Sequence, residues 1–332
     1  MSSDDVIRGA GRRGFLGSVA VGGLAAPAVH AAPAKRKVIF VAHAEIPFFN
    51  QVKAGFRDFG NLRGWDMQYV ARGTPPVIAD VVRFQAEAIA AKPDALAFTR
   101  INETSFEDNI RRALDQRIPL VLFNIASAGY KQLGVNAFVG QDFIPAGRIN
   151  GLQAAIHAVK LGRRDGVILV GLPAINSTAL DERARGTQEG IEAYNRAHGT
   201  TFVVERLQTS NIQRDAIARI EPRIKALGGK LAGFTDMVSG HQFMSPWLEQ
   251  NGMKGKIANG GFDLVPGVLE AIKTGGAQWT IGQNPYAQGW VTSSLLDMQM
   301  ESGYPASDYD TGAEVVDATN IDRIIKREAR FA

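Results

Sequence analysis

The stretch Ile257–Gly289 reads IANGGFDLVPGVLEAIKTGGAQWTIGQNPYAQG, and its pattern is typical of alternating strands and helices. It predicts a strand, a polar turn and a helix, followed by a second strand, a second polar turn and the start of another helix. The first strand is followed by Asp263 and the second by Gln283. In a parallel sheet both side chains are expected at the carboxyl edge, where α/β folds bind small ligands.

The same alternation of strands and helices extends over most of the chain. Such alternation is typical of parallel sheets with right-handed crossovers and helices on both faces. About ten strands are too many for one easily packed sheet, so we expect two sheets of five or six strands, and hence two lobes. The predicted strands lie at 38–43, 67–71, 95–99, 119–124, 137–140, 167–171, 202–207, 231–235, 256–260, 278–282 and 313–316. The predicted helices lie at 48–63, 77–91, 103–116, 144–161, 180–198, 214–227, 241–251, 266–274 and 286–302.

The bulk composition is that of an ordinary globular protein. The chain has 332 residues, of which 45% are hydrophobic and 21% charged, and its length favours about two domains. A net charge of +4, without a run of basic residues interleaved with aromatics, does not favour nucleic-acid binding. There is no cysteine, which excludes disulfides, thiolate metal sites and a lipid anchor on an N-terminal cysteine.

The first 31 residues are predicted to be an export signal of the twin-arginine (Tat) type. Arg12 and Arg13 precede a weakly apolar run from Leu16 to Val29, and Val29-His30-Ala31 fits a signal-peptidase site. An ordinary secretory signal with two adjacent arginines is the alternative. The apolar run is too short to span a membrane. We therefore expect a soluble mature protein in the periplasm.

No familiar catalytic or cofactor motif follows the predicted strands. The chain lacks a glycine-rich dinucleotide fingerprint, a phosphate-binding loop and a nucleophile elbow. Its five histidines have no metal-ligand spacing, so no metal or cofactor is expected. Asp142 and Asp263 could form an acid–base pair, but nothing in the sequence makes them face each other. We expect a binding protein and no enzyme activity.

Several blocks in fixed order resemble the type I periplasmic sugar-binding proteins, the ribose/galactose-type substrate-binding proteins of ABC transporters. The resemblance runs from Val38 to about Val316. The blocks are Ile46-Pro47-Phe48-Phe49, Asp94-Ala95-Leu96-Ala97-Phe98, Arg117–Asn124, Val139-Gly140-Gln141-Asp142 with Ala146-Gly147, Glu182–Gly186, Gly261-Phe262-Asp263 and Thr280–Gly289.

The resemblance implies two Rossmann-like lobes with parallel sheets, joined by a three-crossing hinge. The expected N-terminal lobe comprises residues 38–140 and 284–310, and the C-terminal lobe comprises 141–283 and 311–332. Sugar would bind between the lobes, with Phe48 and Phe49 offering apolar ring faces and Arg183 donating hydrogen bonds. Asp263 and Gln283 would bond hydroxyl groups. The alternatives are a core role for one of the phenylalanines and a helix cap for Asp263.

The chain departs from the ribose-type pattern on the other side of the expected cleft. Ile46 stands where those proteins have Asn, and Asn124-Ile125 stands where they have Asp-Arg. Asn124 offers one acceptor and one donor group in place of a carboxylate, so ribose itself is not the expected ligand. The side chains expected to contribute there are Asn124 together with His43, Glu45, Arg100 or Asn176. For His43 a hydrogen-bonded loop histidine is an equal alternative.

The resemblance implies capture of a neutral monosaccharide (pentose or hexose) or sugar alcohol by hinge closure, and delivery to an inner-membrane ABC permease. We expect a monomer in the periplasm. A chemoreceptor adaptor, a quorum-signal binder and a periplasmic carbohydrate-active enzyme remain open on the same scaffold. A LacI-type regulator shares the fold but needs a DNA-binding headpiece, and the predicted signal peptide occupies that place.

Overall fold

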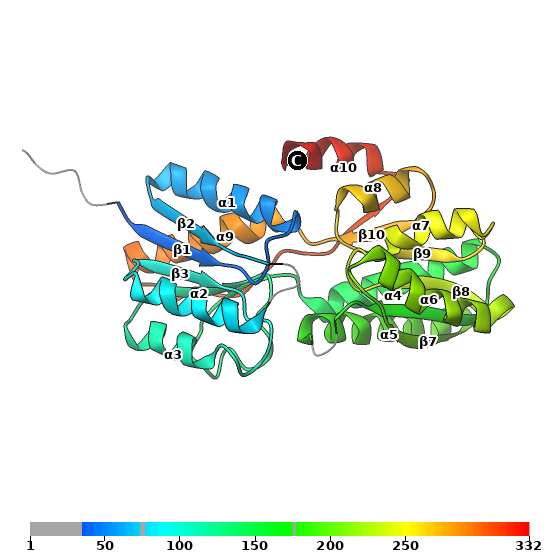
Figure 1. The fold of residues 1–332 in the computed structure, drawn as a ribbon, viewed down its shortest axis with the longest axis horizontal. Coiled ribbons are helices and arrows are strands. Elements are labelled where there is room, and N and C mark those ends of the chain that lie inside the picture. The colour runs from blue at the N-terminus through cyan, green and yellow to red at the C-terminus, as the bar shows by residue number, and fades with distance from the viewer. Residues whose placement is uncertain (1–34, 74–76, 175–176, 332) are drawn as a thin grey trace, which may run out of the picture. The chain divides into compact units, whose positions relative to one another are not determined.

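A computed structural model describes residues 35–73, 77–174 and 177–331, so the predicted signal peptide and Asn176 lie outside the described residues. The described chain builds two six-stranded α/β sheets, ordered β11-β5-β4-β3-β1-β2 and β12-β10-β9-β8-β6-β7. We call the first with its helices the N-lobe and the second with its helices the C-lobe (Figure 1). Two α/β lobes with mostly parallel sheets confirm the predicted fold class.

The N-lobe is built from the first third of the chain and from a later return. Its sheet separates two hydrophobic clusters, because neighbouring residues of a strand point to opposite faces. Phe40 of β1 packs with α1 and α9, whereas Ile39 packs with α2 and α3. The elements are β1 (Lys37–Val41), α1 (Phe48–Arg63), β2 (Asp66–Val70), α2 (Ile78–Ala90), β3 (Ala95–Phe98), α3 (Glu107–Asp115), β4 (Leu120–Phe123), β5 (Phe138–Gly140), α9 (Pro285–Ser302) and β11 (Tyr309–Asp310).

The C-lobe repeats this layering with its own core. Ile168 of β6 packs with α4 and α5, whereas Leu169 packs with α6 and α7. The elements are α4 (Phe143–Lys160), β6 (Asp165–Leu172), α5 (Thr178–His198), β7 (Thr201–Gln208), α6 (Gln213–Leu227), η1 (Gly228–Lys230), β8 (Leu231–Asp236), α7 (His241–Gln250), β9 (Ala258–Phe262), α8 (Pro266–Lys273), β10 (Trp279–Gly282), β12 (Glu314–Asp317), α10 (Ile321–Glu328) and η2 (Ala329–Phe331).

Helices α4 and α5 approach each other closely because glycines face the contact. A Cβ atom on Gly186 would lie 2.2 Å from the carbonyl oxygen of Ile144, and one on Gly147 would lie 2.4 Å from that of Arg183. Only residues without a side chain allow this approach. The contact fixes the first turns of α5, which carry Arg183.

The chain passes between the two sheets at residues 141–142, 283–284 and 311–313. The third passage explains the one antiparallel strand pair in the described sheets, β10 with β12. The chain enters β12 directly from the N-lobe strand β11, without a crossover helix, and therefore runs opposite to its neighbour. The alternation of strands and helices predicts parallel strands throughout, and this strand is the exception.

Besides the short 3-10 helix η2, two elements of the C-terminal segment were not predicted from the sequence. One is the two-residue strand β11, which is too short to give a periodic signal. The other is α10, which buries Ile321 and Ile324 against α8 and β12. Among the described helices none is long and apolar enough to cross a membrane.

Candidate functional site

Asp263 and Gln283 lie side by side at the carboxyl edge of the C-lobe sheet. The Nε2 atom of Gln283 donates a hydrogen bond of 2.6 Å to Oδ1 of Asp263, and each residue is only 6% exposed. The side chain of Asp263 makes no cap hydrogen bond to α8, whose N-cap residue is Val265. Asp263 has a left-handed backbone (φ 73°), a conformation that Asp and Asn tolerate better than most residues. The carboxylate of Asp263 therefore lies directly after strand β9 and does not cap helix α8.

Arg183 is buried at the start of α5 and retains donor capacity. Its Nε and Nη2 atoms donate to Oε1 of Gln141 (3.2 and 2.8 Å), and Nη1 donates to the carbonyl of Met237 (2.9 Å). The guanidinium lies 4.3 Å from the ring centre of Phe262. Burial lowers the pKa of Arg183 to about 10, whereas the negative charge of Asp263 acts in the opposite direction and raises this pKa. The group stays cationic near neutral pH, and two of its five N–H groups make no hydrogen bond to the residues that the structure describes.

Asn124 joins the C-lobe residues through a chain of side-chain amides. It follows β4 directly with a left-handed backbone (φ 63°), and its Nδ2 atom donates a hydrogen bond of 3.0 Å to Oε1 of Gln288. Gln288 in turn donates to the carbonyl of Gln283 (3.2 Å). The sequence-predicted residues Asn124, Gln283 and Asp263 are therefore brought into one buried polar chain that crosses from one sheet to the other.

The two predicted aromatic contacts, Phe48 and Phe49, differ in how deeply they are buried. Phe49 is 1% exposed and packs into the core, with its ring centre 6.4 Å from that of Phe123. Phe48 is partly buried and lies edge-on to Phe49. His43 also contacts Phe49, and burial lowers the pKa of His43 to about 4, so its imidazole is neutral at physiological pH. Its buried Nδ1 has no hydrogen-bond partner among the described residues.

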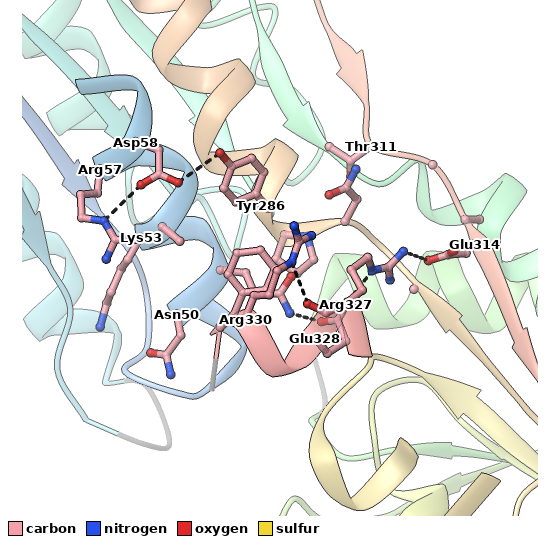
Figure 2. A pocket seen from close by; sticks show the side chains of 18 residues that line it. Asn50, Lys53, Arg57, Asp58, Tyr286, Thr311, Glu314, Arg327, Glu328 and Arg330 are labelled. Carbon is pink, nitrogen blue, oxygen red and sulfur yellow. Dashed lines mark hydrogen bonds and ion pairs between the residues drawn. The ribbon is translucent and has the colours of Figure 1, made fainter. Parts of the chain in front are cut away.

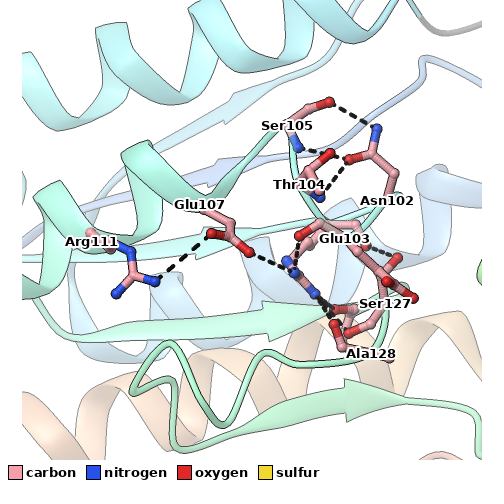
Figure 3. A network of polar contacts seen from close by, with 10 residues as sticks. Asn102, Glu103, Thr104, Ser105, Glu107, Arg111, Ser127 and Ala128 are labelled. Atoms are coloured by element: carbon pink, nitrogen blue, oxygen red, sulfur yellow. Dashed lines mark hydrogen bonds and ion pairs between the residues drawn. The ribbon is translucent and has the colours of Figure 1, made fainter.

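Two of the predicted ligand-binding residues, Glu45 and Arg100, interact with other residues of the N-lobe. Glu45 pairs with Lys53 on α1. Arg100 is 1% exposed and donates to the backbone carbonyls of Ala126, Ser127 and Ala128, at 3.1, 2.8 and 2.6 Å. The network around these carbonyls, which includes Asn102, Glu103 and Glu107, is shown in Figure 3. In this structure Arg100 holds two loops together and does not join Asp263.

A cavity of about 280 Å³ is lined by three of the predicted ligand-binding residues, Phe48, Asp263 and Gln283. Its size is close to the lower end of the range for small-molecule sites. Leu264 and Leu269 provide apolar wall on the C-lobe side. The C-terminal segment contributes a further part of the wall through Ile325, Glu328, Ala329 and Phe331.

Asp236 is a further buried carboxylate whose charge couples to that of Asp263, and it was not among the predicted site residues although it resembles a family site position. It ends β8 and accepts hydrogen bonds from Oγ1 of Thr209 (3.0 Å) and from the backbone N–H groups of Val238 and Gly240 (2.9 and 3.0 Å). Burial raises its pKa to about 6, with the charge of Asp263 adding to the effect. Its position as the polar last residue of the apolar strand β8 is the sequence signal that could have identified it.

A larger groove of about 1110 Å³ lies beside α1 and the C-terminal segment (Figure 2). Five of its seven charged side chains pair with one another: Arg57 with Asp58, and Arg327 with Glu314 and Glu328. These internal pairs leave the groove without a strong charge of one sign. Within the residues that the structure describes, no group of three or more His, Cys, Asp or Glu side chains could hold a metal ion.

Residues 38–303 match the family described as periplasmic binding protein domain. The chain belongs to this family. The match covers both lobes up to the end of α9, and it confirms the resemblance inferred from the sequence motifs. Membership assigns the two sheets and their connecting passages to a scaffold whose members hold small ligands.

The relatives and the solved structures agree with this assignment. The chain is 25% identical over 307 residues to a xylose/arabinose-binding protein of Sulfolobus acidocaldarius, covering 86% of this chain and 72% of the relative. It has the fold of an ABC-transporter solute-binding protein of Burkholderia graminis in complex with D-arabinose, with a TM-score of 0.77, 22% identity, and coverage of 88% and 98% of the two chains. A carbohydrate transporter protein of Acidothermus cellulolyticus in complex with myo-inositol gives a TM-score of 0.75, 20% identity, and coverage of 90% and 99%.

Proposed function

We propose that this protein captures a pentose, a hexose or a sugar alcohol and delivers it to an ABC permease. The observation that carries the proposal is the convergence of Asn124, Arg183, Asp263 and Gln283, which come from both lobes of a periplasmic binding protein. Carboxylate, carboxamide and guanidinium groups together accept from and donate to hydroxyls. A relative named as a xylose/arabinose-binding protein, and similar proteins solved in complex with D-arabinose and with myo-inositol, support this ligand class.

The proposed ligand binds with one face against Phe48 and its hydroxyls against the strand ends. The partly buried ring of Phe48 suits the C–H face of a sugar, and Phe49 supports that ring from the core. Buried polar groups that the wrong isomer leaves unpaired reduce its affinity, which gives selectivity among epimers. His43, Glu45 and Arg100 stay proposed contacts, and for Arg100 and Glu45 contact requires a change of their present partners.

Binding is proposed to proceed by hinge closure. The lobes would move as the units 38–140 with 284–310 and 141–283 with 311–332, turning about the three passages between the sheets. A ligand stabilises the closed form only if it contacts both lobes there. Small-angle scattering with and without ligand measures the closure directly.

We propose that the protein acts without chemical conversion of its ligand. The similar proteins are described as binding and transport proteins, which supports this view. The proposal includes export through the twin-arginine route into the periplasm, a monomeric state and no interaction with nucleic acid. Replacing Arg12 and Arg13 by lysine should retain the protein in the cytoplasm, and fractionation of cells tests it.

A thermal-shift screen against pentoses, hexoses and polyols tests the proposed function. A ligand that binds only the folded state raises the unfolding midpoint by mass action. A concentration-dependent rise with at least one sugar or polyol is expected. No rise with any of them would refute the ligand class, and turnover of a sugar by the purified protein would favour the enzyme alternative.

A further inference from the structure

The buried side chain of Gln141 contacts both Arg183, in the proposed ligand site, and the passages between the two lobes. It is 1% exposed and lies in the first passage between the lobes. Its Oε1 atom accepts both the Nε and the Nη2 hydrogen bonds of Arg183. Its Nε2 atom donates to the carbonyls of Gly282 (3.3 Å) and Gly312 (3.0 Å).

These acceptors lie at the other two passages. Gly282 ends β10, immediately before the second passage, and Gly312 lies within the third. One carboxamide therefore ties all three passages to the guanidinium of Arg183. Both ends of the amide are used, so the Oε1 atom faces Arg183 and the Nε2 atom faces the carbonyls by hydrogen-bond complementarity.

We propose that Gln141 is a positioning residue that fixes Arg183 for the ligand and couples its orientation to the hinge. This inference rests on the proposed function, because it assigns a role at the same site. The guanidinium is held in one plane by two bonds to a single oxygen, while its remaining N–H groups stay available. A change in the relative position of the three passages moves the amide, and the amide moves Arg183.

A glutamine is well suited to this role. Leucine has a similar size but would leave Nε and Nη2 of Arg183 and two buried carbonyls without this partner. Glutamate keeps two acceptors for Arg183 but cannot donate to the carbonyls of Gly282 and Gly312. The two substitutions therefore separate the hold on Arg183 from the tie between the passages.

The test compares the purified wild-type protein with Gln141→Leu and Gln141→Glu. The probe is whichever pentose, hexose or polyol the wild type binds, measured by calorimetric titration. Gln141→Leu is expected to weaken binding about 10–100-fold, the effect of losing hydrogen bonds to a charged group. Gln141→Glu is expected to recover most of this loss, because it again holds Arg183. Closure measured by small-angle scattering should change in both variants, because both lose the tie to the carbonyls.

Asn259→Leu is the matched control, since Asn259 also donates from one amide to two backbone carbonyls, those of His241 and Gly276. It should lower the unfolding midpoint but leave affinity within about 2-fold, as expected for a site independent of the ligand. The inference is overturned if Gln141→Leu binds as tightly as the wild type, if Gln141→Glu binds no better than Gln141→Leu, or if Asn259→Leu weakens binding equally. If the wild type binds no sugar or polyol, the proposed function fails and this inference fails with it.

Discussion

Gln283 donates its side-chain amide to the carboxylate of Asp263 at 2.6 Å, so the two polar strand ends of the C-lobe are hydrogen-bonded to each other. Twenty residues and the whole of α8 separate them in the chain. The parallel pairing of β9 with β10 brings them together. A ligand hydroxyl can donate to the carboxylate while Gln283 keeps that carboxylate in place. The pair therefore forms a preorganised acceptor, and preorganisation reduces the entropy cost of binding.

Asp263→Asn is the informative substitution at this position. It keeps the left-handed backbone, whereas Asp263→Ala adds roughly 1–2 kcal/mol of conformational strain. Asn removes one of the two carboxylate acceptors and the negative charge near Arg183. We expect at least a 10-fold loss of affinity and a modest fall in the unfolding midpoint. Titration calorimetry with a thermal scan measures both, and unchanged affinity would remove Asp263 from the site.

Arg183→Lys should weaken binding by about 10-fold or more. Lysine cannot donate to Gln141 and Met237 at the same time from a planar group, and it loses the stacking on Phe262. Lost hydrogen bonds to a charged group correspond to about 1.5–3 kcal/mol. Arg185→Lys, on the exposed face of the same helix, is the control and should bind like the wild type. Equal affinities for all three proteins would contradict the assignment of Arg183.

Gly186→Ala should separate α4 from α5. Its new methyl group would meet the carbonyl of Ile144, which is backbone and cannot rotate away. Overpacking of this kind costs about 1–3 kcal/mol of stability. We also expect weaker binding, because Arg183 lies one turn earlier on the same helix. Gly229→Ala is the control, since a Cβ there has open space and should change neither quantity. Denaturant unfolding distinguishes the variants, and a fully stable Gly186→Ala protein would contradict the close contact.

The free energy of unfolding should fall as the pH is lowered from about 6.5 towards 5. Burial lowers the pKa values of His43, His157 and His241 to about 4, 4 and 3, so the unfolded chain binds these protons first. Asp236, whose pKa is raised to about 6, acts in the opposite direction because the folded state binds its proton first. Burial also raises the pKa values of Asp263 and Glu182, which act in the same direction as Asp236. The three histidines therefore contribute a loss of stability in acid that these three carboxyl groups offset in part.

His241→Gln isolates the largest of these effects. It removes one proton difference and should reduce the pH slope of the unfolding free energy by up to about 1.4 kcal/mol per pH unit near pH 5. Urea unfolding between pH 5 and 7 measures the slope. The same slope in the variant and the wild type would show that His241 is not buried in its neutral form.

The lobes and most helices could be predicted because their signals are local. Phe49, Val52, Phe56 and Phe59 recur at helical spacing, and α1 forms at Phe48–Arg63 as expected. α10 was missed although Ile321, Ile324 and Ile325 follow the same rule, because it is short and follows the last predicted strand.

The polar chain through the hinge could be predicted only in part. Asp263 and Gln283 stand out as polar residues after apolar strands, and this position is visible in the sequence. The roles of Gln141 and Gln288 depend on contacts between passages that are far apart in the chain, 141 residues apart for Gln141 and Gly282. Arg100 shows the reverse case: a basic residue after a strand suggests ligand contact, yet loop carbonyls of the same lobe surround it.

Calorimetric titration of the purified protein with D-xylose, arabinose, galactose, glucose and myo-inositol tests the central claim most directly. We expect saturable binding of one ligand per chain to at least one of them, with a Kd on the order of micromolar or tighter. We further expect that Asp263→Asn abolishes or strongly weakens the same signal. Absence of binding to every sugar and polyol by a folded wild-type protein would contradict the account.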